Sequence, residues 1–372
     1  MTLSTPKGLE PGLSTSPESS VASKSLASLV SLIIVNYNGG EATSRCLDLL
    51  LTGPDRPGQV IVVDNGSSDE SRIYLENIQE AGLRRGLRVV WSEQNTGYAG
   101  GVNLGASFAN RPYLAIMNMD VEVEPDWLLP AVAFLEATPQ AGAVSPLILL
   151  SDGQRINAEG QDVHVTGLGF NRHLYYPFGH ASPAPVPVSG IHGAAFIVRR
   201  SLFEEVGGMD AGAFLYHEDV NISWLLQLMG YDLYCVPGSR VRHHYDLSMH
   251  PAKLMLLERN RLTMLLSYCS LPFLLALAVP LACTEAMMWG YCLLQGWTFL
   301  KAKGSSYRQI VGRWSQIIAR RSLARKVRTR SDWQMLGRLR WFYALDQFTK
   351  LARERGARRR SWDLPPREPV QG

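Results

Sequence analysis

Short apolar segments that end in polar residues recur through the first half of the chain. Residues 31–38 are SLIIVNYN and residues 59–65 are QVIVVDN. Apolar residues at helical spacing follow each of them, over 41–51 and 72–81. Strands that alternate with helices form a mostly parallel sheet, because each helix returns the chain to the edge where the next strand begins. The pattern therefore predicts an α/β fold. Further strands of this kind are predicted at 89–95, 112–120 and 141–149.

The predicted strands end in polar side chains that a ligand can use. In a parallel sheet the carboxyl ends of neighbouring strands meet at one edge, and ligands bind there. Residues 150–190 are rich in Gly, Pro and aromatic residues, which predicts an irregular loop that faces the substrate. We expect a binding site along this edge. The strand-end residues are Asn36, Tyr37, Asn38, Asp64, Asn65, Asn95, Asn118 and Asp120.

Two neighbouring carboxylates, Glu218 and Asp219, precede a predicted amphipathic helix over 219–229. The positive end of a helix holds such a pair in place and keeps it ionised. A fixed carboxylate is suited to take a proton from a hydroxyl group. The pair by itself is also consistent with a simple N-terminal cap.

Asp120 follows the predicted strand at 112–118 in the triplet Asn118-Met119-Asp120. Carboxylate oxygens are the ligands that Mg²⁺ and Mn²⁺ prefer, and these ions bridge phosphate oxygens. A strand-end Asp also commonly closes a turn. His243 and His244 follow the last predicted core strand, where they fit a metal site or a surface loop equally well.

Several motifs in fixed order resemble the family 2 glycosyltransferases of GT-A fold, over about residues 31–265. The chain is most similar to the bacterial rhamnosyltransferase-type members, which extend lipid-linked or surface polysaccharides. The resemblance implies an inverting transfer of a sugar from a UDP- or dTDP-linked donor to a hydroxyl of a lipid-linked or glycan acceptor. The matching motifs are SLIIVNYN, VVDNGSSDES, NTGYAGGVNLGA, NMDVEVEPDWL and GMDAGAFLYHEDVNISWLLQLMGYDLYCVPGSRVRHH.

The resemblance also implies roles for donor-side residues. Tyr37 would stack on the nucleobase and Asp64 would form a hydrogen bond with it. Asp120 would bind Mg²⁺ or Mn²⁺. Because Asn118 stands where a full DxD motif has its first carboxylate, diphosphate and water would supply most of the metal's other ligands. The remaining donor-side positions are Asn38, Asn95, Gly97 and Asn103.

On the acceptor side, the resemblance places Asp219 on the catalytic base, with Glu218 in support, and His243 near the metal or the diphosphate. His217 is expected to position the pair, and His192 to contact the acceptor or to pack. Three cations of segment 250–262, Lys253, Arg259 and Arg261, are hypothesised to bind a lipid diphosphate.

Three other functions fit parts of the same pattern. A nucleotidyltransferase shares the nucleotide-binding first part of the fold and the metal-binding carboxylate. It does not need a second pair of carboxylates, such as Glu218 and Asp219, to act as a general base. A non-catalytic sugar- or lipid-binding scaffold would need neither Asp120 nor Asp219. A dehydrogenase is excluded because the glycines of 95–105 lack the dinucleotide-binding spacing directly after the first strand.

The composition divides the chain into five predicted regions. Residues 1–28 are rich in Ser, Thr, Pro and Gly and predict a disordered leader, and residues 29–265 form the catalytic domain. Residues 266–300 are apolar, residues 301–360 are basic and amphipathic, and residues 361–372 are predicted to be disordered.

The apolar run over 271–300 is long enough for a membrane-spanning helix. A single crossing, however, would separate the donor site from the basic arm that follows, and both belong on the cytoplasmic side. We therefore predict a re-entrant or interfacial hairpin bent at Pro280, or helices lying in the membrane plane. A packed helical subdomain without membrane contact is the alternative.

The basic arm carries 19 Lys and Arg against 5 Asp and Glu over 301–372, a net charge of +14. Because the whole chain has a net charge of +4, residues 1–300 carry −10. The arm lacks a nucleic-acid recognition motif and adjoins an apolar run, which favours an anionic membrane surface as its partner. The expected location is the cytoplasmic face of the cell membrane.

Overall fold

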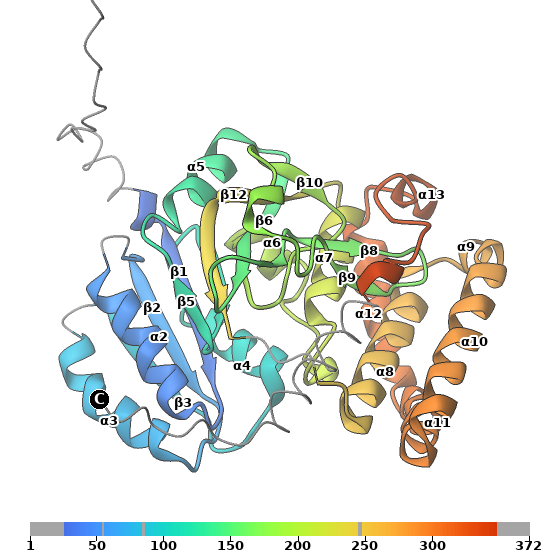
Figure 1. The fold of residues 1–372 in the computed structure, drawn as a ribbon, viewed down its shortest axis with the longest axis horizontal. Coiled ribbons are helices and arrows are strands. Elements are labelled where there is room, and N and C mark those ends of the chain that lie inside the picture. The colour runs from blue at the N-terminus through green and yellow to red at the C-terminus, as the bar shows by residue number, and fades with distance from the viewer. Residues whose placement is uncertain (1–25, 54–55, 84–85, 245–247, 348–372) are drawn as a thin grey trace, which may run out of the picture.

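The computed structural model describes residues 26–53, 56–83, 86–244 and 248–347. Almost all of the predicted leader at 1–28 lies outside these residues, as do the predicted tail at 361–372 and the end of the basic arm. The described part has a central sheet with helices on both faces, and a layer of helices from the C-terminal third lies beside it (Figure 1).

Four parallel strands form one half of the sheet, in the order β3-β2-β1-β4. Their side chains alternate between two apolar cores, because successive residues of a strand point to opposite faces. Along β1, Ile33 and Val35 belong to one core, whereas Leu32 and Ile34 belong to the other. The strands are β1 (Val30–Asn36), β2 (Gln59–Asp64), β3 (Leu87–Trp91) and β4 (Tyr113–Asn118).

Helices cover both faces of this sheet, as the alternating pattern predicts. Helices α2, α3 and α5 bury their apolar sides in the core of Leu32, and α4, α6 and α7 in the core of Ile33. The helices are α2 (Gly40–Thr52), α3 (Glu70–Leu83), α4 (Gly97–Ala106), α5 (Leu129–Ala137), α6 (Arg200–Glu205) and α7 (Glu218–Leu228).

The other half of the sheet is mixed, which the pattern of alternating strands and helices did not predict. Strand β11 (Ala195–Arg199) runs antiparallel to β4 and to β6 (Ala141–Leu150). Strand β12 (Asp232–His243) is parallel to β6 but antiparallel to β10 (Val186–Val188) and to β5 (Val121–Val123). The α/β class is therefore confirmed, with a sheet that is parallel in one half and mixed in the other.

The segment 150–190 is more ordered than the predicted irregular loop. It contains the short strands β7 (Ile156–Ala158), β8 (Gln161–Val163) and β9 (Gly169–Asn171), and the 3-10 helix η1 (Phe178–His180). Strands of three residues carry too little periodicity to be detected from sequence. A second 3-10 helix, η2 (Ala211–Ala213), precedes α7.

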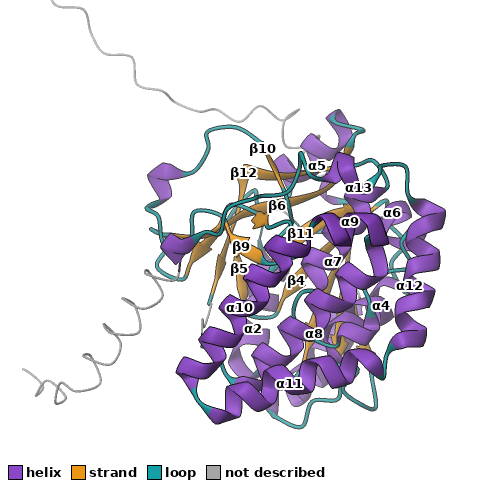
Figure 2. Ribbon diagram, turned by 90° about the vertical axis from the view of Figure 1, so that its right-hand side faces the viewer, coloured by secondary structure: helices purple, strands orange, loops and turns teal. Residues whose placement is uncertain are grey.

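A layer of helices follows β12 and faces the viewer in Figure 2. Helix α8 crosses the predicted domain boundary at residue 265 and packs against both α7 and α11. None of the described helices combines the length and the apolar character needed to cross a membrane. The helices are α8 (Pro251–Tyr268), α9 (Leu271–Ala276), α10 (Ala278–Gln295), α11 (Trp297–Val311), α12 (Trp314–Val327) and α13 (Asp332–Met335).

The apolar run forms a helical hairpin, but its turn is not at Pro280. Helices α10 and α11 are joined at Gly296, whose φ of 100° favours glycine. Pro280 lies in the first turn of α10, where a missing backbone N–H breaks no helical hydrogen bond. The predicted bend at Pro280 is therefore wrong.

Many arginines of the basic arm bind the protein itself. Arg321 donates to the carbonyls of Leu266 and Cys269, and Arg330 pairs with Asp232 at 2.9 Å. Arg340 pairs with Asp162, also at 2.9 Å. The positive charge of the arm therefore partly serves to attach α12 and α13 to the acidic body, a use that the sequence analysis did not predict.

Candidate active site

A cavity of about 1950 Å³ opens at the carboxyl ends of β1 and β4 and continues toward α8 and α10. It contains most of the residues that the sequence singled out, from segments far apart in the chain. Residues of the 150–190 segment, among them Gln161 and Phe170, line it as predicted. The predicted site residues in the lining are Tyr37, Asn95, Gly97, Asn118, Asp120, His192, His217, Glu218, Asp219, His243 and Lys253.

Asp219 lies in the first turn of α7 and is held by three hydrogen-bond donors. The backbone N–H of Gly193 and the Nε2 of Gln161 donate to its Oδ2, at 2.8 and 3.0 Å. The N–H of Val220 donates to its Oδ1 at 2.8 Å. A carboxylate fixed in this way cannot rotate away from a substrate. The arrangement fits a positioned general base.

Gly193 is required by this close approach. A Cβ atom at this position would lie 3.0 Å from Asp219 Oδ2, so a side chain would push the carboxylate away. Gln161 comes from β8, in a segment whose sequence gives no sign of its role. Its contact with Asp219 is a functional feature that sequence analysis missed, because the two residues are 58 positions apart.

The loop before Asp219 has an unusual backbone. Phe214, Tyr216 and His217 have φ values of 65°, 68° and 71°, a region that residues other than glycine rarely occupy. Asn260 of α8 holds the loop, because its Nδ2 donates to the carbonyls of Ala213 and Tyr216 at 3.0 and 2.7 Å. Strain of this kind is retained where a site needs a particular geometry.

Arg259 is part of the same support and not of the cavity lining defined by the described residues. Its Nη2 donates to the carbonyl of Ala213 at 2.6 Å, and its Nη1 donates to Gln309 at 2.9 Å. The side chain is buried behind the loop. The hypothesis that Arg259 binds a lipid diphosphate is therefore not supported by its position, whereas Lys253 does line the cavity.

Glu218 is buried beside Asp219, and its Oε2 has no hydrogen-bond partner among the described residues. Burial and the neighbouring carboxylate raise the pKa of Glu218 to about 8. Burial also raises the pKa of Asp219, although its hydrogen-bond donors oppose this. Two close buried carboxylates cannot both ionise easily, so Glu218 keeps its proton near neutral pH. The expectation that the helix end keeps both carboxylates ionised is therefore wrong for Glu218.

This raised pKa has a consequence for stability. Unfolded Glu218 loses its proton near pH 4.5, whereas the folded protein keeps it to about pH 8, so stability falls as pH rises through this window. Glu218→Gln removes the ionisation. We expect the variant to gain thermal stability over the native protein at pH 8 and to gain little at pH 5. Melting temperatures measured across this range check the prediction, and a difference that does not vary with pH would contradict it.

Asp120 and His243 are brought together by strand pairing. His243 pairs with Val121 in the antiparallel ladder of β12 and β5, and the N–H of His244 donates to the Asp120 carbonyl at 3.1 Å. His243 Nε2 then lies 3.4 Å from Asp120 Oδ1. On its other side, His243 Nδ1 is 3.0 Å from Asn157 Oδ1.

These contacts fit a divalent cation. When His243 Nδ1 donates to Asn157, the lone pair of Nε2 faces Asp120 Oδ1, a buried atom without a hydrogen-bond partner among the described residues. Two acceptors that face each other are satisfied by a positive ion between them. No group of three His, Cys, Asp or Glu in the described part of the chain forms a protein cage. Other ligands would have to come from the substrate and water, as Asn118 suggests.

His192 and His217, which also line the cavity, are neutral. Burial lowers the pKa of His192 to about 3 and that of His217 to about 4. His192 Nδ1 accepts the N–H of Ala194 at 3.1 Å, which leaves Nε2–H to donate. His217 Nε2 contacts the Gly167 carbonyl at 2.8 Å. A neutral His192 near the cavity can donate to an oxygen of a substrate without adding charge.

On the donor side, Asn65 and Asn95 organise the loop that begins α4. Asn95 Oδ1 accepts from Asn65 Nδ2 and from the Gly97 N–H, at 3.1 and 2.8 Å. A Cβ atom on Gly97, whose φ is 76°, would lie 2.3 Å from the Phe214 carbonyl oxygen. Glycine is therefore required here for backbone packing. Tyr37 is 44% exposed at the cavity edge, where its ring is accessible for stacking.

Three predicted donor-side residues lie outside the lining that the described residues define. Asp64 is fully buried, and it accepts from Asn36 Nδ2 at 2.9 Å and from the Ser67 N–H at 3.2 Å. Asn38 accepts from the Ser68 N–H. Asn103 connects α4 to Met209 through two hydrogen bonds of 2.8 and 2.9 Å. In this structure these side chains form hydrogen bonds within the protein that hold the loops after β1 and β2 and helix α4.

Comparison with known proteins agrees with this geometry. Residues 31–207 match the family described as glycosyl transferase family 2. The chain is 28% identical over 243 residues to N-acetylglucosaminyl-diphospho-decaprenol L-rhamnosyltransferase of Mycobacterium tuberculosis. The aligned region covers 59% of this chain and 77% of that enzyme. The chain therefore carries a family 2 glycosyltransferase domain over residues 31–207.

Further similarities extend this result. The glycosyltransferase is 26% identical over 207 residues to the low-salt glycan biosynthesis hexosyltransferase Agl10 of Haloferax volcanii, covering 52% of this chain and 60% of that protein. The structure of GalNAc-T7 with UDP, GalNAc and Mn²⁺ aligns with a TM-score of 0.53 at 21% identity, over 65% of this chain and 48% of that chain. The chain thus spans about half of that structure. This likeness shows a fold of the GT-A type.

Proposed function

We propose that this glycosyltransferase transfers a sugar, with rhamnose as the first candidate, from a UDP- or dTDP-linked donor to a hydroxyl of a lipid-linked or glycan acceptor in cell-surface glycan synthesis. The observation that carries the proposal is the single cavity that joins Asp120 and His243 at one side to the fixed Asp219 at the other. The name of the mycobacterial relative supports the sugar and the lipid-linked acceptor.

The donor is proposed to bind at the carboxyl ends of β1 and β4. Tyr37 stacks on the base, and the loop held by Asn65 and Asn95 borders the donor. Asp120 and His243 would hold Mg²⁺ or Mn²⁺, and the Mn²⁺ in the GalNAc-T7 structure supports such an ion. A bound divalent ion would neutralise the charge that develops on the departing diphosphate. Asp120 and the neutral His192 keep this side of the cavity polar.

In the proposed reaction, the acceptor hydroxyl lies against Asp219 and attacks the anomeric carbon on the face opposite the diphosphate. Asp219 Oδ1 or Oδ2 takes the hydroxyl proton as the new glycosidic bond forms and the bond to the diphosphate breaks. Gln161 and the Gly193 N–H keep the carboxylate in position during this step. One displacement of this kind inverts the anomeric configuration.

We further propose that the enzyme acts at the cytoplasmic face of the cell membrane. Helices α9 and α10 expose large apolar side chains, including Leu275, Val279 and Leu293, at 66%, 74% and 69%. Exposed tryptophans lie nearby in sequence, Trp297 at 68% and Trp314 at 55%. Tryptophan is favoured at the membrane interface, and helices with such faces lie in the membrane plane.

The decisive experiment is a screen of nucleotide sugars for release of the nucleoside diphosphate, with Mg²⁺ or Mn²⁺ and a lipid-linked acceptor. We expect release of UDP or dTDP together with a glycosylated acceptor. A nucleotidyltransferase would instead release inorganic diphosphate from a nucleoside triphosphate and a sugar phosphate. Absence of both products across the screen would contradict the proposal.

Lys253 is the cation expected to meet a phosphate group of the acceptor. It lies in the first turn of α8, lines the cavity, and has its Nζ 5.2 Å from the centre of the Tyr216 ring. Lys253→Ala is expected to raise the KM for a diphosphate-linked acceptor about tenfold and to leave the KM for the donor unchanged, because one charge-assisted contact is lost. An unchanged acceptor KM would remove Lys253 from this role.

A further inference from the structure

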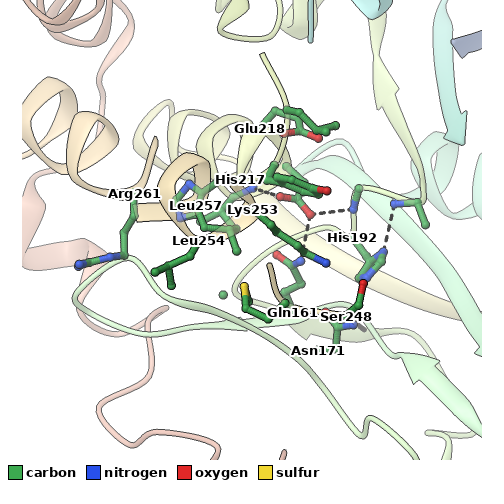
Figure 3. A pocket seen from close by; sticks show the side chains of 18 of the residues that line it. Gln161, Asn171, His192, His217, Glu218, Ser248, Lys253, Leu254, Leu257 and Arg261 are labelled. Carbon is green, nitrogen blue, oxygen red and sulfur yellow. Dashed lines mark hydrogen bonds between the residues drawn. The ribbon is translucent and has the colours of Figure 1, made fainter. Parts of the chain in front are cut away.

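The cavity has two regions of opposite character. One region is polar and holds Asp120, Asp219 and His192. The other lies between α8 and α10 and is apolar; we refer to it as the apolar arm. Figure 3 shows its α8 wall, with Leu254 and Leu257 beside Lys253. The apolar arm consists of Met249, Leu254, Leu257, Met288, Tyr291 and Leu294.

The apolar arm is built by helical spacing. Leu254 and Leu257 are three residues apart on α8, and Met288, Tyr291 and Leu294 follow one another at intervals of three on α10, so each set shares a helix face. Leu254 is buried and packs in one apolar cluster with Met249, Met288 and Tyr291. This cluster joins α8 to α10 and α11, which gives the apolar arm a packed wall.

The charged residues that line the same region are paired. Arg261 donates to both oxygens of Glu258, at 2.9 and 2.8 Å, and to Glu285 at 2.6 Å. Lys303 also pairs with Glu258 and with Glu285. Burial by itself would raise the pKa of Glu258, but the charges of Arg261 and Lys303 lower this pKa to about 2. Two cations and two anions cancel, so this part of the cavity wall has no net charge to repel a hydrocarbon chain.

The apolar arm is continuous with an exposed apolar face. Gly290 and Leu294 line the cavity and are also exposed, Leu294 at 86%. Every exposed residue of α10 in the described structure except Gln295 is apolar, so the helix presents an apolar surface from its first turn to its last. An extended exposed apolar surface of this kind marks a site of interaction with a ligand, a protein or a membrane. These exposed residues are Ala278, Val279, Ala282, Cys283, Ala286, Trp289, Gly290, Leu293, Leu294 and Gln295.

We propose that the apolar arm binds the first part of the hydrocarbon chain of a lipid-linked acceptor, which leaves the cavity past Gly290 and Leu294. The proposal rests on the proposed function and adds the place of the chain. One cavity holds a group for each part of such a molecule: Asp219 for the sugar hydroxyl, Lys253 for the phosphate groups and the apolar arm for the chain. A free sugar or a polysaccharide would leave the apolar arm filled with water, which its lining disfavours.

The test compares two probes, farnesyl diphosphate and inorganic diphosphate, by calorimetric titration of the full chain. Burial of only two methylene groups increases affinity about tenfold. Farnesyl diphosphate is therefore expected to bind about tenfold more tightly than inorganic diphosphate, or tighter still. Leu257→Gln and Met288→Gln place a polar group in the apolar arm and are expected to remove most of this difference. Both residues are only partly buried, and melting temperatures confirm that the variants fold.

Leu293→Gln is the matched control. Leu293 is 69% exposed on the same helix, next to Leu294, but it lies outside the cavity lining. Its substitution is expected to leave the affinity for farnesyl diphosphate unchanged. Equal affinity of the native protein for the two probes would overturn the proposal. So would an equal loss in Leu293→Gln and Leu257→Gln, because the chain would then lie on the outer face of α10.

The two proposals can fail separately. Release of nucleoside diphosphate from a nucleotide sugar depends on the polar region and is measured without farnesyl diphosphate. If the enzyme transfers sugar but binds both probes equally, the proposed function stands and the apolar arm has no role in chain binding. If farnesyl diphosphate is preferred but no nucleotide sugar is consumed, the proposed reaction is wrong.

Discussion

Asp219→Asn is expected to lower the rate of sugar transfer by about 10²- to 10⁴-fold, the usual contribution of a positioned general base. The amide has the size of the carboxylate but cannot take the hydroxyl proton. Donor binding should be unchanged, because Asp219, which Gly193 and Gln161 hold in place, is proposed to contact the acceptor. The measurement combines single-turnover transfer with titration of the nucleoside diphosphate.

Glu218, the carboxylate next to Asp219, provides the control for this experiment. Glu218→Gln changes the adjacent carboxylate without removing Asp219, and it should reduce transfer far less than Asp219→Asn. As the pH is lowered, the activity of the native enzyme should fall when Asp219 takes up a proton. Because burial raises the pKa of Asp219, this fall should occur at a higher pH than for an ordinary Asp. Substantial turnover by Asp219→Asn would assign the base to another group.

Asp120→Ala is expected to weaken donor binding and to raise the concentration of Mn²⁺ or Mg²⁺ required for half-maximal activity. The variant loses the buried Oδ1 that faces His243 at 3.4 Å, so a cation would keep only the imidazole and ligands from the substrate. We expect a loss of about 10²- to 10³-fold in kcat/KM, as for other groups that stabilise developing charge.

A matched control is Glu124→Ala, which removes a carboxylate close in sequence. Glu124 follows β5 and pairs with Arg240 and Arg242, away from the cavity lining. Its loss should leave the metal titration unchanged. If Asp120→Ala and Glu124→Ala give the same metal titration as the native enzyme, Asp120 serves as a turn residue and not as a metal ligand.

The sequence located the two ends of the site because both belong to local patterns. Asp120 follows a predicted strand, and Asp219 begins a predicted helix, and such positions depend on neighbours within a few residues. The structure places both in one cavity. Arg259 shows the limit of the same argument. Its position in the sequence suggested phosphate binding, but its guanidinium turns behind the loop and binds the carbonyl of Ala213.

The residues that sequence analysis missed act across long separations. Gln161 contacts Asp219 from 58 positions away, and Asn157 contacts His243 from 86 positions away. Neither lies in a periodic segment, because their strands are three residues long. The pairing of β12 with β5, which brings His243 to Asp120, likewise depends on sheet register and not on local sequence.

The sequence by itself therefore determined the α/β class, the family and the two carboxylates of the site, since periodicity and ordered motifs are properties of short stretches of chain. Tertiary structure decided the mixed half of the sheet, the supports of Asp219 and the close approach of Asp120 to His243. It also decided that the apolar run turns at Gly296 and that much of the basic arm binds the body of the protein. These features depend on which distant surfaces pack together, and side-chain direction and strand register are fixed only when they do.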